Sequence, residues 1–207
     1  MNDLLIIGSG GHSRAVISAA LLSKKWNLVG VIDINFKEKE NILGIPCVGS
    51  LEKLSSYSRQ STKIFISFGD NKVRESIYSN TIVKDFEKVS IIHPKSLIDP
   101  SSKIGVSNFI GPFANIGPNV LIGSNNVINS YCNIEHETVV GDFNDFAPSS
   151  VICGRCKLGN NIFIGASATV IDKITIENNN VIGAGSVIIT DIKGQGKTYV
   201  GVPGKAL

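Results

Sequence analysis

Residues 110–123 read IGPFANIGPNVLIG, and the repeat within this stretch decides the fold. Every sixth residue is isoleucine, and each of these isoleucines precedes a glycine. The same spacing continues in both directions without a change of frame, so that seventeen successive positions hold a large apolar residue. These positions are Ile92, Ile98, Ile104, Ile110, Ile116, Ile122, Ile128, Ile134, Val140, Phe146, Ile152, Leu158, Ile164, Val170, Ile176, Ile182 and Ile188.

A period of six distinguishes this region from the common alternatives. An amphipathic helix has a period of 3.6, and a β-sandwich would lose the frame at each hairpin. Short strands separated by tight corners fit the repeat. Three strands make one coil, and the region should form about five to six coils. The first residue of each hexad then points into the interior, and neighbouring Gly and Asn residues are expected in the left-handed conformation at the corners. We predict a parallel β-helix over residues 91–193, followed by a C-terminal tail at 194–207.

Residues 1–90 follow a different pattern. A short apolar strand at 4–7 leads into the glycine turn GSGGHS at 8–13, and an amphipathic helix is expected from Arg14 to about Lys24. Further strands are expected at 29–33 and 64–69, with a helix over 71–79. Strand, glycine turn, helix and strand form a βαβ unit. We predict a small Rossmann-like α/β module.

The composition is that of a globular chain, with 43% hydrophobic and 18% charged residues and a net charge of +3. The basic residues form no run, so nucleic acid is not an expected partner. The apolar run at 4–7 is too short for a secretion signal, and no stretch is long enough to span a membrane. We predict a cytoplasmic protein without a membrane or nucleic-acid partner.

The four cysteines are expected to be free thiols. Cys153 and Cys156 have the spacing of a redox or zinc pair, but a redox pair normally opens a helix and zinc requires a second pair. Both are predicted to be packing residues, and no metal is expected. His93, which precedes Pro94, is expected to be structural.

Several motifs together resemble the left-handed β-helix acetyltransferases. The motifs are the glycine turn with His12, the segment 68–71 with Arg74, the segments 91–94 and 134–137, and VPGK at 202–205. The resemblance is to the branch that acetylates nucleotide-linked amino sugars or sialic acids, and it covers essentially the whole chain. It implies a homotrimer, with acetyl-CoA in the groove between neighbouring β-helices.

His136 is the candidate general base. An amine or hydroxyl that attacks a thioester needs a base near neutral pH, and histidine is suited to that role. The thioester is already activated, so positioning and one base suffice. Glu137 resembles the acid that orients the histidine in this family. Adjacent side chains of a strand point to opposite faces, so this pair requires a bent backbone.

The resemblance implies further contacts on the β-helix. A backbone N–H stabilises the oxyanion of the transition state in such enzymes, and the family places this donor at Gly154. Acetyl-CoA contacts are implied at Ala166 and Ala184. Several relatives carry a second histidine against the acetyl group where this chain has Asp145, so the role of Asp145 stays open.

The N-terminal module is predicted to bind the sugar nucleotide. Exposed N–H groups at a helix start suit phosphate, although the turn lacks the third glycine of the dinucleotide fingerprint. Asp33 follows the turn at about the same sequence spacing as the ribose-binding acid of that fingerprint. A tight turn that merely packs helix on strand is the alternative. The expected binding residues are Gly8, Gly10, Gly11, His12, Ser13, Asp33, Gly69, Asn71 and Arg74.

These features predict an acetyl-CoA-dependent N-acetyltransferase of a nucleotide-linked 4-amino sugar, active in bacterial surface glycan biosynthesis. O-acetylation of a sialic acid or a related sugar uses the same base and donor and is the nearest alternative. A non-catalytic nucleotide-binding regulator on a β-helix scaffold is the alternative from another class. Neither the sugar nor the nucleotide base can be named from the sequence.

Overall fold

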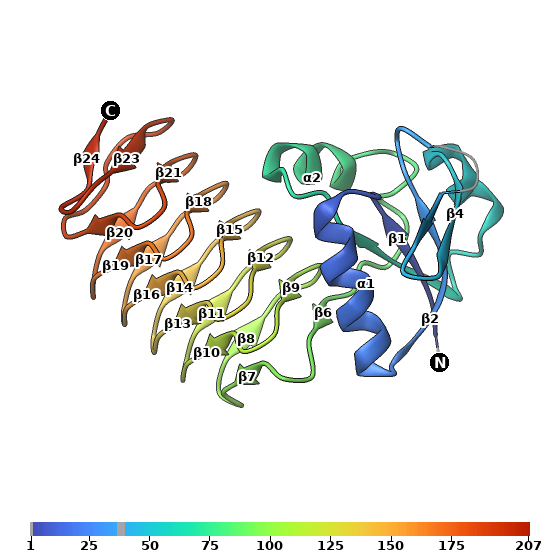
Figure 1. Cartoon of the computed structure of the whole chain (residues 1–207), viewed down its shortest axis with the longest axis horizontal. Helices are drawn as coiled ribbons and strands as arrows, with labels where there is room; N and C mark the ends of the chain where they lie inside the picture. The colour runs from blue at the N-terminus through green and yellow to red at the C-terminus, as the bar shows by residue number, and fades with distance from the viewer. Residues whose placement is uncertain (1, 37–39) are drawn as a thin grey trace. The chain divides into compact units, whose positions relative to one another are not determined.

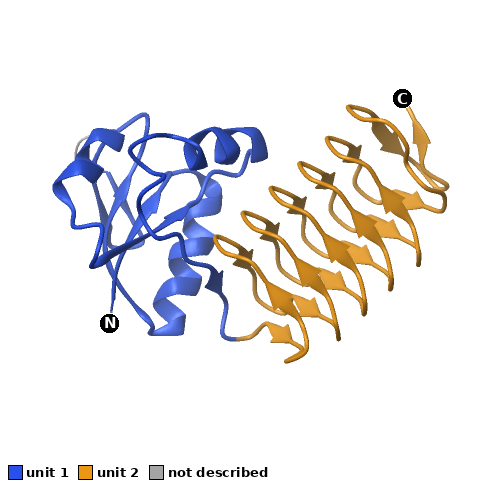
Figure 2. Ribbon diagram, turned by 180° about the vertical axis from the view of Figure 1, so that it is seen from behind, with its two compact units in different colours: residues 1–94 blue, residues 95–207 orange. Residues whose placement is uncertain are grey.

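The structure is a computed structural model that describes residues 2–36 and 40–207. The chain divides into two compact units, Met1–Pro94 and Lys95–Leu207 (Figure 2).

The first unit is built around a five-stranded sheet in the order β3-β4-β2-β1-β5 (Figure 1). Its strands are β1 (Asn2–Ile7), β2 (Trp26–Ile32), β3 (Asn41–Ile42), β4 (Ile45–Gly49) and β5 (Thr62–Ile66). Neighbouring strands run parallel except for the antiparallel pair of β3 and β4. The helices are α1 (Gly11–Ser23), the 3₁₀ helix η1 (Leu51–Ser56) and α2 (Asn71–Tyr78), and β6 (Ile91–Ile92) follows near the end of the unit.

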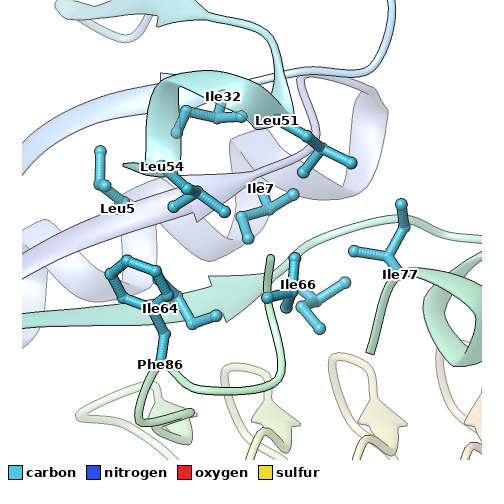
Figure 3. Packing of buried hydrophobic residues seen from close by; sticks show 10 residues of the cluster. Leu5, Ile7, Ile32, Leu51, Leu54, Ile64, Ile66, Ile77 and Phe86 are labelled. Carbon is cyan, nitrogen blue, oxygen red and sulfur yellow. The ribbon is translucent and has the colours of Figure 1, made fainter. Parts of the chain in front are cut away.

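The βαβ unit predicted from the sequence is confirmed by β1, α1 and β2. Helix α1 begins at Gly11, three residues before the expected start at Arg14, because Gly10 in an extended conformation already ends the turn. The short elements β3, β4 and η1 were not predicted. Buried side chains of β1, β2, η1, β5 and α2 form the core of this unit, with Ile7 and Ile66 among them (Figure 3).

The second unit is a parallel β-helix of two-residue strands in three sheets, which confirms the predicted fold class (Figure 1). Sheet I holds β7 (Leu97–Ile98), β10 (Asn115–Ile116), β13 (Asn133–Ile134), β16 (Val151–Ile152), β19 (Thr169–Val170) and β22 (Val187–Ile188). Sheet II holds β8 (Lys103–Ile104), β11 (Leu121–Ile122), β14 (Val139–Val140), β17 (Lys157–Leu158) and β20 (Thr175–Ile176). Sheet III includes β9 (Phe109–Ile110), β12 (Val127–Ile128), β15 (Asp145–Phe146), β18 (Phe163–Ile164), β21 (Val181–Ile182), β23 (Thr198–Val200) and β24 (Lys205–Ala206).

Each strand pairs with the strand eighteen residues away in the next coil, as Asn133 pairs with Asn115 and Val151. The inward residues of successive coils stack in the interior, where Ile134, Ile152 and Ile164 are fully buried. The residues beyond 194 take part in this architecture, because β23 pairs with β21 and β24 turns back against β23.

The corners of the coils stack into three edges that run along the β-helix. The His136 edge joins sheet I to sheet II and comprises residues 117–120, 135–138, 153–156 and 171–174. The Tyr131 edge joins sheet III to sheet I and comprises residues 111–114, 129–132, 147–150, 165–168 and 183–186. The Asn edge joins sheet II to sheet III and comprises residues 105–108, 123–126, 141–144, 159–162 and 177–180.

From Ile104 to Ile176, the residue three positions after each inward residue is left-handed, with φ between 56° and 64°. The non-glycine residues in this conformation are Ser107, Phe113, Asn119, Asn125, Tyr131, Glu137, Phe143, Ser149, Arg155, Asn161, Ser167, Lys173 and Asn179. The expectation that Asn126, Asn160, Asn178 and Asn180 adopt it is wrong. Asn160 and Asn178 instead accept hydrogen bonds through Oδ1 from backbone N–H groups of the preceding coil.

The glycines that follow the inward residues serve a different purpose from the one expected. Gly117 and Gly165 do not have positive φ. A Cβ atom at Gly117 would lie 2.9 Å from the backbone nitrogen of His136, and one at Gly165 would lie 2.5 Å from that of Ala184. Glycine is required there because the next coil approaches too closely for any side chain.

Candidate active site

His136 lies on the edge that bears its name, in the corner between β13 and β14. Its side chain is 44% exposed, so the ring faces outward as predicted. Nδ1 lies 3.1 Å from Oε2 of Glu137. Nε2 has no hydrogen-bond partner among the residues that the structure describes. This arrangement leaves one ring nitrogen free for a substrate while the other is held by a carboxylate.

The backbone of Glu137 explains how adjacent residues can share one face. Glu137 is the left-handed corner residue of its coil, with a φ of 60°. In a strand its side chain would point away from that of His136. The turn of the corner brings the two side chains together, and the Glu137 N–H is fixed by the Pro118 carbonyl at 2.9 Å.

Gly154 lies one coil further along the same edge, directly against the imidazole. The Arg155 N–H donates to the His136 carbonyl at 2.9 Å, which fixes the register of the two coils. A Cβ atom at Gly154 would lie 2.5 Å from Cε1 and 2.6 Å from Nε2 of the ring. Within the described residues the Gly154 N–H donates to no other group. His136, Glu137 and a free backbone donor thus meet at one point of the surface.

A polar chain that the sequence reading did not identify runs towards this point across sheet I. The Asn115 amide donates to Asn133 Oδ1 at 2.7 Å, and the Asn133 amide donates to Glu135 Oε1 at 2.6 Å. Asn115 and Glu135 also line a cavity of about 340 Å³ beside Pro118. Alternate positions of strand residues point outward, so Asn115 and Asn133 could have been paired from the hexad frame.

The structure places the other predicted acetyl-CoA residues away from His136. Ala166 and Ala184 are exposed and lie in successive coils of the Tyr131 edge. Asp145 belongs to β15 in sheet III, where it is 7% exposed and lies 3.4 Å from the Asn129 amide. Sheet I separates the Tyr131 edge from the His136 edge, so one chain does not bring the two groups together.

In the first unit the glycine turn is closed by Asp33. Gly8 has a φ of 115°, a conformation that favours glycine. The Ser9 N–H donates to Asp33 Oδ2 at 2.5 Å, and the Asn35 N–H donates to Oδ1 at 2.7 Å. Both carboxylate oxygens therefore accept backbone hydrogen bonds, and the Ser9 N–H is occupied by an acid of the chain itself.

Ser13 is fully buried, and its hydroxyl donates to the Gly8 carbonyl at 2.6 Å. By contrast, Gly10 and Gly11 at the start of α1 face open space, since a Cβ atom at either would meet nothing within 4 Å. No acidic side chain lies in the first turn of α1, and no side chain caps it. The open N–H groups of the turn are therefore those at Gly10 and Gly11.

His12, Gly69 and Arg74 lie close together. Arg74 is 2% exposed and donates to the carbonyls of Phe68 and Gly69, both at 3.0 Å. Burial, together with the positive charge of Arg74, lowers the pKa of His12 to about 4. Asn71 is the first residue of α2, beside the capping residue Asp70. His12 is therefore neutral near pH 7.

The cysteines are free thiols, and burial raises the pKa of Cys132 to about 12 and that of Cys156 to about 11. Among the described residues there is no cluster of His, Cys, Asp or Glu side chains with the arrangement of a metal site. No helix within residues 2–36 and 40–207 is both long and apolar enough to cross a membrane.

Residues 3–81 match the PglD N-terminal domain family. The chain is 27% identical over 177 residues to a GDP-perosamine N-acetyltransferase of Escherichia coli O157:H7, covering 81% of this chain and 77% of that protein. The GDP-perosamine N-acetyltransferase of Caulobacter crescentus superposes with a TM-score of 0.92 at 26% identity, over 100% of this chain and 97% of that one.

The chain is thus similar over its whole length to β-helix acetyltransferases. The acetyltransferase domain of PglB from Neisseria gonorrhoeae FA1090 has a TM-score of 0.92 at 25% identity, over 100% of this chain and 99% of that one. The PglB domain was solved with acetyl coenzyme A, and the Caulobacter crescentus protein, as a histidine-to-alanine variant, with CoA and GDP-perosamine. The family resemblance inferred from the sequence motifs is confirmed.

Proposed function

We propose that this acetyltransferase transfers the acetyl group of acetyl-CoA to the amine of a nucleotide-linked 4-amino sugar, in the cytoplasmic stage of bacterial surface glycan biosynthesis. The observation that carries the proposal is the meeting of His136, Glu137 and the free N–H of Gly154 at one point of the surface. Relatives named as N-acetyltransferases of GDP-perosamine support the substrate class.

The residues account for each step of the transfer. The free Nε2 of His136 takes a proton from the sugar amine, whose nitrogen then forms a bond to the thioester carbonyl carbon. The Gly154 N–H stabilises the negative charge on the carbonyl oxygen. When the carbon–sulfur bond breaks, the sulfur of CoA receives the proton from the imidazolium, and the products are the N-acetyl sugar and CoA. Glu137 holds the ring and stabilises its charged form.

The active enzyme in this proposal is a homotrimer. Three of the four predicted acetyl-CoA residues lie on two edges of one β-helix, with Gly154 on the His136 edge and Ala166 and Ala184 on the Tyr131 edge. A donor molecule that touches both sets must lie between the His136 edge of one subunit and the Tyr131 edge of its neighbour. Cyclic symmetry repeats this groove at each interface and closes the ring.

The first unit supplies the nucleotide site in this proposal. The open N–H groups of Gly10 and Gly11 at the start of α1 suit the diphosphate, because helix starts attract anions. Asp33 occupies the Ser9 N–H, so we assign the phosphate contact to Gly10 and Gly11 rather than to Ser9. Neutral His12 and buried Arg74 lie beside Gly69, and we place the remaining nucleotide contacts there.

The test is an assay of the purified protein with acetyl-CoA and a panel of UDP-, GDP- and dTDP-linked 4-amino sugars, with CoA release and product mass as readouts. The His136→Ala variant should lower kcat by about 10²–10⁴-fold, the usual worth of a positioned base, while KM for acetyl-CoA stays close to that of the parent. Acetyl transfer to hydroxyl acceptors alone, or to no sugar at all, would contradict the proposal.

A nucleotide-binding regulator without catalysis would give a different pattern. Thermal shifts with UDP and GDP but none with CoA would favour it, since only ligands of the native state raise the unfolding temperature.

A further inference from the structure

Two exposed aromatic rings lie in successive coils of the Tyr131 edge. The centroids of Phe113 and Tyr131 are 5.0 Å apart, and their planes differ by 17°. Phe113 is 47% exposed and Tyr131 is 60% exposed. The ammonium group of Lys95 lies 5.6 Å from the centroid of Phe113. The rings thus form a stack on the surface rather than part of the core.

The backbone makes these positions costly for aromatic residues. Phe113 and Tyr131 have φ values of 58° and 59°. A residue other than glycine in this left-handed conformation costs about 1–2 kcal/mol, and bulky residues are rare there. Further along the same edge the equivalent residues are the small Ser149, Ser167 and Gly185. Because this conformation recurs at the corners of all three edges, what distinguishes Phe113 and Tyr131 is their stacking in two successive coils of one edge.

The Tyr131 ring is largely exposed, at 60%. Phe113 stacks against the ring from the preceding coil, whereas the following coil offers Pro148 and Ser149. The phenol hydroxyl of Tyr131 has no hydrogen-bond partner among the residues described. A flat apolar surface with a free hydroxyl at its rim is left for a ligand.

Tyr131 and His136 belong to one coil but flank sheet I from opposite edges. Strand β13 lies between them, with the outward side chain of Asn133. We therefore assign the Tyr131 ring to the His136 of a neighbouring chain rather than to that of its own. In a trimer whose symmetry axis runs along the β-helices, a given residue lies at the same height along the axis in all three subunits. Tyr131 of a neighbour then faces His136, and its exposed ring points to the level of Gly154.

We propose that the Phe113–Tyr131 stack is the platform on which the amino-sugar ring of the acceptor lies when its amine meets His136 of the adjacent subunit. The proposal rests on the trimeric acetyltransferase proposed above. Aromatic rings attract the apolar C–H face of a sugar ring, and an ammonium group held over Tyr131 is attracted to the same ring face. The platform thereby selects an uncharged ring with a basic amine.

Replacement of the ring tests the platform. Tyr131→Ala should raise KM for the sugar nucleotide about 10-fold, which corresponds to about 1.4 kcal/mol, and leave KM for acetyl-CoA unchanged. Tyr131→Phe keeps the ring and should retain the parental KM. A KM for the acceptor that stays within 2-fold in Tyr131→Ala would overturn the proposal. So would a monomeric Tyr131→Ala protein, because the ring would then be a subunit contact.

Mixed trimers test whether the platform acts across the interface. Tyr131→Ala and His136→Ala chains are co-expressed with different tags, and the mixed trimers are assayed at low acceptor concentration. If Tyr131 serves the neighbour, one site in three of each mixed trimer combines an intact Tyr131 with an intact His136. Half of the chains keep His136, so without help from the neighbour the mixed trimers would have about half of the activity of the Tyr131→Ala trimer. If Tyr131 serves the neighbour, their activity should be several-fold higher than that. No such gain would overturn the proposal, whereas a parent without acetyl transfer would instead refute the proposed function.

Discussion

The imidazole of His136 occupies the space that a side chain at Gly154 would need. A Cβ atom built on Gly154 lies 2.5 Å from Cε1 and 3.1 Å from Nδ1 of the ring. The contact joins successive coils of one edge, so the position of the ring depends on the stacking of the β-helix. The absence of a side chain at Gly154 also leaves its N–H accessible to a substrate oxygen.

Gly154→Ala should displace the imidazole and cover the N–H, because the new Cβ conflicts with the ring rather than with backbone. We expect kcat to fall about 10²-fold or more, as when an oxyanion donor is lost, with little change in unfolding temperature. Steady-state kinetics and thermal unfolding measure the two effects. In a His136→Ala background, Gly154→Ala should lower kcat by a much smaller factor than in the parent, since the effects of residues in contact are not additive. Additive losses would contradict the contact.

Glu137→Asn should separate the role of the carboxylate from that of the backbone. Asn119, Asn125, Asn161 and Asn179 occupy the equivalent left-handed position in other coils, so asparagine fits there without strain. The substitution removes the negative charge beside Nδ1 of His136 and shortens the side chain by one methylene group. We expect kcat to fall by less than in His136→Ala, with unchanged stability. A variant with full turnover would show that the Glu137 carboxylate is not needed to position the ring.

Ile152→Ala should destabilise the β-helix by about 2–5 kcal/mol, because Ile152 is fully buried in the stacked interior. Denaturant unfolding followed by far-UV circular dichroism gives this difference. Leu121→Ala is the matched control, since Leu121 is 43% exposed on the outside of sheet II and should change stability by less than about 1 kcal/mol. Equal effects of the two substitutions would show that the inward assignment of Ile152 is wrong.

The first unit should lose stability as the pH falls from about 6.5 to about 4. The pKa of His12 is about 4 in the folded protein and 6.5 when unperturbed, so between these values the unfolded chain binds a proton that the folded chain does not. Protonation then favours unfolding, by up to about 3 kcal/mol over this range. Fluorescence of Trp26, the single tryptophan, reports the unfolding of this unit. His12→Gln should flatten the profile, and an unchanged slope would show that His12 titrates normally.

The sequence predicted the β-helix because its signal is periodic and local. A large apolar residue at every sixth position specifies which side chains point inward, whatever the neighbouring coils contain. The outward position of His136 followed from the same frame. The conformation of Glu137 did not, because a left-handed corner can hold serine, asparagine, phenylalanine or arginine as well, and the residue type alone does not reveal it.

The hexapeptide repeat also did not reveal why glycine is required at particular positions. Gly117 lies one position after an inward residue and Gly154 two positions after one, but the repeat does not show that the first makes room for the backbone of the next coil and the second for the ring of His136. Which atoms approach a glycine depends on a chain segment eighteen residues away and on its register. Short strands such as β3 and β4 escaped prediction for a similar reason, since two to five residues carry too little periodic signal to be recognised.

The sequence by itself determined the repeat, the inward face and the βαβ module, and it indicated His136 as the candidate base. Only the tertiary structure decided which of these residues meet. It placed Gly154 against His136 and turned the Glu137 carboxylate towards Nδ1. It also put Ala166 and Ala184 on another edge and stacked Phe113 on Tyr131. The physical reason is that periodicity fixes the direction of each side chain within its coil, whereas contacts between coils depend on how eighteen-residue turns stack upon one another.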